Sequence, residues 1–511
     1  MGPWLALLGV LSVVLLPLFL VEIPAVYDYP NHIAGLHVLT RHGADAALSR
    51  NYTIEWALQP NLASQLLALP LGGLFSAYQI GRMLLALALA LPLLGTFLLY
   101  RVLHGRFGYW PAVASLFLYN HVLAIGTLNY VIAKGLALLG LAAWLWLRPR
   151  LPWAALFVGM STALALYVAH LFAFACYSLA VLLHAAWQAR ELPRSQTPRK
   201  LGGVLFACLP MLLPAILALA VGVQFSGDYT AYGGVGAKFV ALLSPVLFFG
   251  TAADYLTFAV VCVGLVRLFF SRQLVVVREM RLVLLGLAVV AILMPSYLGS
   301  IWAADWRLPA LLAFMLVAAT RLQPRSPIAP RLIAATVIIL LLVRVWSVGT
   351  HWQALDAHYA EFRSAAQALP RGARLLTVEN GPDAPRPANY FRYAHVHMSA
   401  LAVIERGAFV PTLFTFSGPI KASAENRLLN APSGGPLSPA ALRQGADPAE
   451  AGKLGQMIGS GGTPYYWAGW PRHFDYVIWL HYGAGAAGVP EGRLVPLAEG
   501  SFFTLYRVIK G

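Results

Sequence analysis

The feature that most constrains this chain is a series of long apolar runs separated by short polar gaps. Runs such as 83–100 and 201–223 approach or exceed the roughly 20 residues that a helix needs to cross a bilayer. Among the 511 residues, 59% are hydrophobic and only 11% are charged. These figures are typical of a polytopic membrane protein and not of a large soluble enzyme.

The net charge of +16 would suggest nucleic-acid binding in a soluble protein, but its distribution indicates membrane orientation instead. The basic residues collect in short gaps between apolar runs: Arg101 and Arg106; Arg148 and Arg150; Arg190, Arg194, Arg199 and Lys200; Arg267, Arg272, Arg278 and Arg281; and Arg321, Arg325 and Arg331. Because cytoplasmic loops are rich in Lys and Arg, we place these gaps inside the cell and expect no nucleic-acid partner.

With the basic gaps inside, the chain follows one consistent path. The first run, 4–20, lacks a basic flank and a clear cleavage site, so we expect a retained span, with a cleaved signal peptide as the alternative. About eleven spans follow from the ~30 Å bilayer requirement. They are expected near 4–22, 82–101, 109–127, 130–147, 152–169, 171–188, 203–222, 251–269, 282–299, 307–320 and 331–348. The N-terminus is then inside and the C-terminus outside, and 61–76 is an apolar helix at the outer interface.

The C-terminal region differs from the rest, because 351–511 contains no run long enough to span. Strand-like stretches occur at 373–378, 476–480 and 502–508, and a Gly/Pro/Ser/Ala-rich segment separates the first from the second, with a loop expected over 428–462. The sequence therefore predicts a transmembrane module over 1–350, with a first external loop over 23–80 that carries juxtamembrane helices. A small extracytoplasmic α/β domain follows over 351–511.

Most of the remaining polar residues fall at the outer ends of the predicted spans. They are Asp28, His32, His37, Asn120, His121, Asn129, Tyr130, Lys134, His170, Asp228, Lys238, Asp254, Asp305 and Arg307. A charge at membrane depth costs several kcal/mol unless it is paired or faces water. We therefore expect a hydrated cavity at the outer face, where these groups converge.

Asp28 is the strongest catalytic candidate. It lies in YDYPNH just after the first span, and Pro30 disfavours a helix that begins before it. A helix is expected over 31–48, with Asn31 or a neighbour as its cap. A carboxylate held at this turn is suited to act as general base toward a hydroxyl or amine. The alternative is a helix-capping aspartate in a solvated loop.

The region around Asp28 resembles the GT-C superfamily of membrane glycosyltransferases, which includes the protein O-mannosyltransferases and the lipid A aminoarabinose transferase. The resemblance lies in Asp28 within YDYPNH, in QPNLASQLLALPLGGLF (59–75) and in IGRMLLALALALPLLGTFLLYRVLHGRFG (80–108). It implies transfer of a hexose or pentose from a polyprenyl-phosphate donor to an envelope glycan, lipid or protein, on the outer face of a bacterial cytoplasmic membrane. The family often has two adjacent acidic residues here, whereas Tyr29 follows Asp28. The cofactor is therefore left open, with a divalent cation as one candidate.

Several further residues are predicted to bind substrate. Arg307 could bind a phosphate with its fork of donors, or pair with Asp305, or extend toward the membrane interface. His32, His170, Asn129 and Lys134 contribute polar groups at the same face. His395 and His397 are spaced like alternate strand residues on one side, where they would bind acceptor or cover the cavity. No metal site is predicted.

Two alternatives to a transferase remain open. A transporter or flippase for a lipid-linked saccharide usually carries polar groups near the bilayer midplane and repeated halves, and neither is evident here. The other alternative is a non-catalytic envelope scaffold, in which Asp28→Asn changes nothing.

Overall fold

The computed structural model describes residues 2–220, 230–298, 301–380, 394–415, 418–431, 435–446, 465–481, 488–490 and 492–510. The chain forms two compact units. The first unit comprises Met1–Phe19, Leu58–Ser64 and Leu84–Gly349, and the second comprises Leu20–Ala57, Gln65–Met83 and Thr350–Gly511. The predicted domain boundary near residue 350 stays a prediction.

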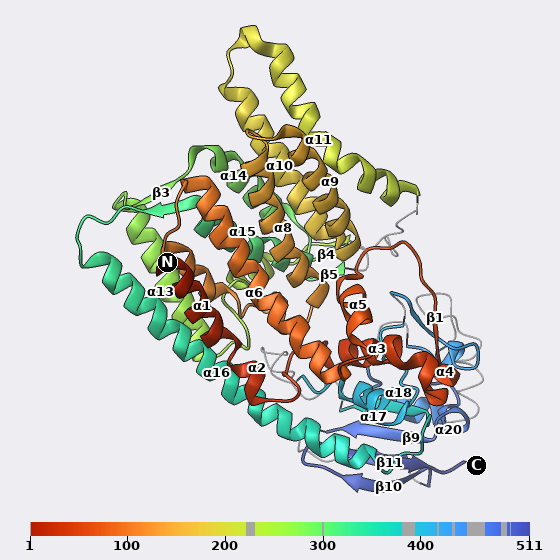
Figure 1. Cartoon of the computed structure of the whole chain (residues 1–511). Helices are drawn as coiled ribbons and strands as arrows, with labels where there is room; N and C mark the ends of the chain where they lie inside the picture. The colour runs from red at the N-terminus through yellow and green to blue at the C-terminus, as the bar shows by residue number, and fades with distance from the viewer. Residues whose placement is uncertain are drawn as a thin grey trace. The chain divides into compact units, whose positions relative to one another are not determined.

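The predicted polytopic helical architecture is confirmed. Among the described residues, 8 helical segments are long and apolar enough to cross a membrane, judged by length and composition. They are Gly2–Leu20, Ala77–His104, Leu128–Leu147, Pro152–Ala169, Leu171–Glu191, Arg194–Ala220, Ala252–Phe270 and Ala329–Ala366. In Figure 1 they correspond to α1 (Gly2–Leu15) with α2 (Pro17–Leu20), α6, α8, α9, α10, α11 (Thr197–Ala220) with a preceding 3-10 turn, α13 and α16.

The other three predicted spans are shorter or interrupted helices. The segment predicted at 109–127 is a 3-10 helix, Trp110–Phe117, followed by α7 (His121–Ile125). The break occurs because the Asn120 side chain accepts a hydrogen bond from the Leu123 N–H and starts a new helix. The other two are α14 (Arg281–Leu293) and α15 (Ala304–Ala319), of 13 and 16 residues.

The three predicted C-terminal strands are confirmed as β7 (Leu375–Glu379), β9 (Tyr476–Leu480) and β11 (Phe503–Val508). Together with β10 (Leu494–Glu499) they form a sheet in the order β10-β11-β9-β7 (Figure 1). The β7–β9 pair is parallel, with Leu375 opposite Tyr476, and the other pairs are antiparallel. Nearly all residues of β7 and β9 are buried, although β7 lies at one end of the sheet. The partly exposed edge strand β10 was not predicted, because Pro496 interrupts its short apolar stretch.

The second unit also contains short helices and a small sheet. Its helices are α3 (Tyr29–Arg41), α4 (Ala46–Asn51), α17 (Leu401–Arg406), α18 (Pro439–Ala446) and α20 (Trp470–His473), and β1 (Tyr52–Ile54) pairs with β8 (Ile420–Ala422). The first unit has α12 (Val235–Leu243), a sheet of β2 (Thr230–Ala231), β4 (Tyr297–Leu298) and β5 (Ile301–Trp302), and the pair β3 (Leu274–Val276) and β6 (Thr320–Leu322).

The predicted helix over 31–48 forms as two helices, α3 and α4. Asp45 divides them, because its side chain accepts hydrogen bonds from the N–H groups of Ala47 and Leu48 and so caps α4. The predicted apolar helix over 61–76 forms only as α5 (Ala63–Ala68) and a 3-10 turn that contains Pro70. The loop expected over 428–462 includes α18, while 447–462 lies outside the described residues.

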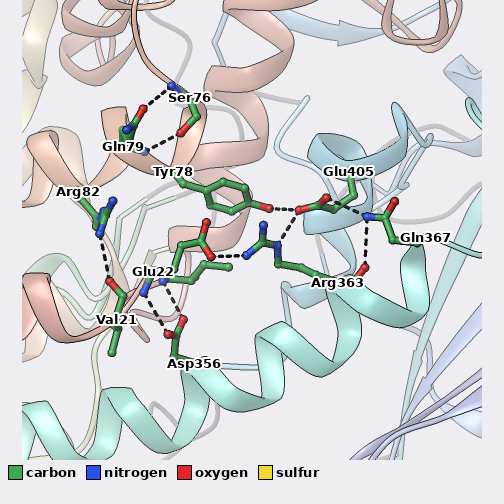
Figure 2. A network of polar contacts seen from close by, with 11 residues as sticks. Val21, Glu22, Ser76, Tyr78, Gln79, Arg82, Asp356, Arg363, Gln367 and Glu405 are labelled. Carbon is green, nitrogen blue, oxygen red and sulfur yellow. Dashed lines mark hydrogen bonds and ion pairs between the residues drawn. The ribbon is translucent and has the colours of Figure 1, made fainter.

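A polar network in the second unit fixes the stretch that leads to Asp28 (Figure 2). Asp356, on α16, accepts hydrogen bonds from the backbone N–H of Glu22 and of the next residue, at 3.0 and 2.9 Å. Arg363 lies about two helical turns further along α16. Its guanidinium is 2.6 Å from carboxylate oxygens of both Glu22 and Glu405. Tyr78 also donates to Glu405, at 2.6 Å. The non-helical backbone at residues 22 and 23 therefore obtains its hydrogen-bond acceptors from Asp356, a side chain of a long helix.

Candidate functional site

Asp28 lies at the N-terminal end of α3, but its side chain makes no capping hydrogen bond. Instead its Oδ1 atom lies 3.3 Å from Nε2 of His397. The Asp28 side chain is 19% exposed and that of His397 is 6% exposed. The carboxylate is thus held against a buried ring while it keeps access to solvent.

Asn31, on the first turn of α3, contacts the other nitrogen of the His397 ring. Its Nδ2 atom lies 2.7 Å from His397 Nδ1 and 3.0 Å from the backbone oxygen of Thr412. Its Oδ1 atom accepts a hydrogen bond from the backbone N–H of Phe414, at 3.0 Å. Asn31 is 1% exposed. Asp28 therefore contacts one nitrogen of the His397 ring, and Asn31 contacts the other. We call these three side chains the Asp28 cluster.

Aromatic rings enclose the Asp28 cluster. Tyr27 meets the His397 ring edge-on, with centroids 5.3 Å apart, and Phe414 does so at 5.2 Å. His32 contacts the same Phe414 ring at 5.8 Å. The predicted residues Asp28, His32 and His397 thus lie around one patch of the second unit.

His395 belongs to a different group of side chains. Residues 394–397 form a turn that leads into a 3-10 helix, so the predicted strand alternation of His395 and His397 is wrong. The Nε2 atom of His395 lies 2.9 Å from Nδ1 of His358, and its ring is 4.5 Å from that of Phe502. Among the described residues, no group of three or more His, Cys, Asp or Glu could hold a metal ion.

Burial of His395 predicts a pH-dependent stability. Burial, with the charges of His358 and His351, lowers the pKa of His395 to about 3. An unfolded histidine has a pKa of about 6.5, so the unfolded state binds more protons as the pH falls below that value. The neutral, buried form of His395 therefore makes its full contribution to the free energy of unfolding above about pH 6.5, and this contribution is lost as the pH falls toward 3. At pH 5 the expected loss is about 2 kcal/mol. The His395→Phe variant should lose less stability than the wild type when the pH is lowered from about 7.5 to about 5, as measured by thermal unfolding. Equal losses would contradict the prediction.

Two buried cations lie on facing helices of the first unit. Lys134, on α8, is 1% exposed, and its Nζ atom is 4.6 Å from the centre of the Phe314 ring on α15. Arg307, near the start of α15, is 8% exposed and lies over Tyr130 of α8, at 6.0 Å. Tyr130 also donates a hydrogen bond to the backbone oxygen of Arg307, at 2.6 Å. Positions 130 and 134 are one helical turn apart, so both cations lie along one α8–α15 contact.

Among the described residues, neither cation has an ion-pair partner. In the part of the chain that the structure describes, Nζ of Lys134 and Nε and Nη1 of Arg307 have no hydrogen-bond acceptor. Asp305 does not pair with Arg307. It is fully buried and accepts hydrogen bonds from Ser296 Oγ at 2.7 Å and Lys238 Nζ at 3.3 Å. Lys134 and Arg307, which we call the cation pair, therefore retain donors for an anionic ligand.

His170 lies beside the cation pair. It occupies the turn between α9 and α10, where its Nδ1 atom accepts a hydrogen bond from the Phe172 N–H at 3.2 Å. Its ring is 5.2 Å from that of Tyr130. Burial and the positive charge of Arg307 hold the pKa of His170 well below its usual value. His170 is therefore a neutral neighbour of Arg307.

Asn129 holds the backbone at residues 61 and 64. Its Oδ1 atom accepts from the Ser64 N–H at 2.7 Å, and its Nδ2 atom donates to the Asn61 oxygen at 2.5 Å. Asn61 has a φ of 73°, a conformation that asparagine tolerates better than most residues. These contacts shape the loop that precedes α5.

Sequence reasoning missed two residues that the structure brings into prominence. Asn31 was interpreted only as a helix cap, and nothing local indicates its contact with His397. Arg344 lies within a predicted span and pairs with Asp254 at 2.9 Å, with both side chains buried. A charge inside an apolar run was a usable signal, because such residues are almost always paired. Asp28 lies in the second unit and Arg307 in the first, and their predicted convergence stays a prediction.

Comparisons with known proteins give structural matches only. No protein-family model and no curated protein matches the chain. ArnT from Cupriavidus metallidurans, bound to undecaprenyl phosphate, matches with a TM-score of 0.50 and 12% identity over 98% of this chain and 97% of ArnT. The same protein in its apo state gives a TM-score of 0.46 and 12% identity over 100% and 98%. The chain therefore has an ArnT-like fold over almost its whole length, as its resemblance to the GT-C glycosyltransferases implied.

Proposed function

We propose that the protein is a membrane glycosyltransferase that moves a hexose or pentose from a polyprenyl-phosphate donor to a hydroxyl or amine acceptor. The observation that carries this proposal is the cation pair, Lys134 and Arg307, whose buried donors have no acceptor among the described residues. Leaving such groups unpaired costs several kcal/mol, which a bound phosphate would offset. The ArnT-like fold supports the same ligand class, because the ArnT match has undecaprenyl phosphate bound.

The reaction explains why cations and a carboxylate are both needed. The acceptor oxygen or nitrogen forms a bond to the anomeric carbon, while the bond from that carbon to the phosphate oxygen breaks. The departing phosphate keeps the electron pair, so its charge changes from one negative charge to two. Arg307 and Lys134 would stabilise this second charge. Asp28 would take the proton that the acceptor loses and become neutral, so that atoms and charges balance.

The proposed setting follows from the distribution of basic residues along the chain. We place the reaction at the outer face of a bacterial cytoplasmic membrane, with the N-terminus inside and the C-terminal region outside. The acceptor is then an envelope glycan, lipid or protein. A transporter or flippase would also bind the donor lipid but would transfer no sugar.

The test is binding of undecaprenyl phosphate to the purified protein in lipid nanodiscs. Lys134→Met and Arg307→Met should each weaken binding by about 10- to 100-fold, because each removes a charge-assisted contact of about 1.5–3 kcal/mol. Methionine has a similar volume and removes an unpaired buried charge, so neither variant should unfold at a lower temperature than the wild type.

The matched control for the binding test is Arg148→Met. Arg148 lies just beyond the other end of α8 and donates to the Gly203 oxygen at 2.9 Å. This variant should bind undecaprenyl phosphate like the wild type. If the two variants of the cation pair also bind normally, the proposed phosphate site is refuted.

A further inference from the structure

We propose that His397 is a positioning residue for Asp28, held by Asn31 in the tautomer that carries its proton on Nε2. This inference rests on the proposed role of Asp28 as general base. It concerns how the protein keeps that carboxylate oriented and ready to accept a proton.

The orientation of the Asn31 amide is determined by two backbone groups. The Thr412 carbonyl can only accept a hydrogen bond, so the atom 3.0 Å from it must be the amide nitrogen. The Phe414 N–H can only donate, so the atom 3.0 Å from it must be the amide oxygen. Because both contacts agree, the amide cannot be flipped without creating a donor–donor and an acceptor–acceptor contact.

This orientation determines the protonation of His397. Asn31 Nδ2 is a donor, and it lies 2.7 Å from His397 Nδ1, so Nδ1 must accept with its lone pair. In a neutral imidazole the proton is then on Nε2, which lies 3.3 Å from Asp28 Oδ1 and donates to it. A proton added to Nδ1 would face the amide donor at short range. Asn31 thus leaves Nε2 as the nitrogen that carries the proton, and this N–H faces Asp28.

The enclosure of the ring reinforces this arrangement. Tyr27 and Phe414 contact the ring at 5.3 and 5.2 Å between centroids, and His397 as a residue is 5% exposed. The titratable groups around it include Asp28, Tyr27 and, beyond Phe414, His32. One oxygen of Asp28 is therefore held by a fixed N–H donor, while the carboxylate as a whole keeps its solvent-facing edge.

Two substitutions of His397 separate positioning from proton transfer. Glutamine can accept from Asn31 through its amide oxygen and donate to Asp28 through its amide nitrogen, so it imitates the proposed tautomer. We expect His397→Gln to keep sugar transfer within about 10-fold of the wild type, with an unchanged pH profile. His397→Leu removes a hydrogen bond to a charged group and should lose roughly 10- to 100-fold. The proposal would be overturned if the His397→Gln variant were as inactive as His397→Leu, or if His397→Gln had an altered pH profile.

A second measurement needs no activity. Nitrogen NMR of histidine-labelled protein, with the His397 signals assigned by their loss in His397→Gln, should show an unprotonated Nδ1 and a protonated Nε2 at neutral pH. A proton on Nδ1 at this pH would refute the inference. If Asp28→Asn retains full activity, the proposed function fails while the NMR result stands. If Asp28→Asn is inactive and His397→Leu is fully active, only the present inference fails.

Discussion

Replacing Asp28 by asparagine should lower the rate of sugar transfer about 1,000-fold, because a positioned general base contributes roughly 10²–10⁴-fold to such reactions. An amide cannot take the acceptor's proton. Asparagine has nearly the same size as aspartate and still offers an oxygen to His397 Nε2, 3.3 Å away in the wild type. The variant should therefore fold and insert normally. The measurement is the initial rate of transfer from undecaprenyl-phosphate hexoses and pentoses to a cell-envelope extract, with purified protein in nanodiscs.

Asp45→Asn is the matched control for this experiment. Asp45 lies in the same connecting region, caps α4 and pairs with Arg371. Its pKa lies below the usual value through the hydrogen bond from Arg371, although burial opposes this shift. Asp45→Asn should cost some stability but leave the transfer rate unchanged. A wild-type rate in Asp28→Asn would favour a transporter or a scaffold over the transferase.

The largest expected loss of stability follows replacement of Asp254 by leucine. One carboxylate oxygen of Asp254 accepts hydrogen bonds from the N–H groups of Phe248 and Phe249, at 3.0 Å each, and of Thr251 at 3.2 Å. The other oxygen lies 2.9 Å from Nη1 of Arg344, whose Nη2 atom donates to the backbone oxygen of Tyr119. The Asp254→Leu substitution removes the carboxylate that accepts from these three N–H groups and from the buried Arg344. We expect a loss of about 3–5 kcal/mol, as is usual when one partner of a buried ion pair is removed.

Thermal unfolding in detergent, followed by intrinsic fluorescence, measures this loss as a fall of the melting temperature. The double variant Asp254→Leu with Arg344→Leu should recover part of it, because no unpaired charge then remains. Glu425→Leu is the control: its partner, Nη2 of Arg374, lies 3.8 Å away, and the Glu425 side chain is 67% exposed. That substitution should cost less than about 1 kcal/mol. A melting temperature of Asp254→Leu equal to that of the wild type would contradict the prediction.

Local patterns in the chain were sufficient for most of the architecture. An apolar run long enough to cross a bilayer forms a helix wherever it lies, and 8 of the described helical segments meet this requirement. The strands β7, β9 and β11 were predicted because β-branched and aromatic residues bounded by turn residues favour extended structure in any surroundings. Local patterns failed where one side chain redirects the backbone, as Asn120 and Asp45 do. They also failed at the edge strand β10, whose short apolar stretch contains Pro496.

The candidate site divides in the same way. Asp28, Lys134 and Arg307 could be singled out from the amino-acid order, because an ionisable residue next to or within an apolar run is costly and therefore conspicuous. Their partners could not. Asn31 and His397 are 366 residues apart in sequence yet 2.7 Å apart in space, and His395, two residues before His397, faces a different group of side chains. Periodicity and composition describe neighbours along the chain, whereas such contacts arise only when distant segments pack together and exclude water.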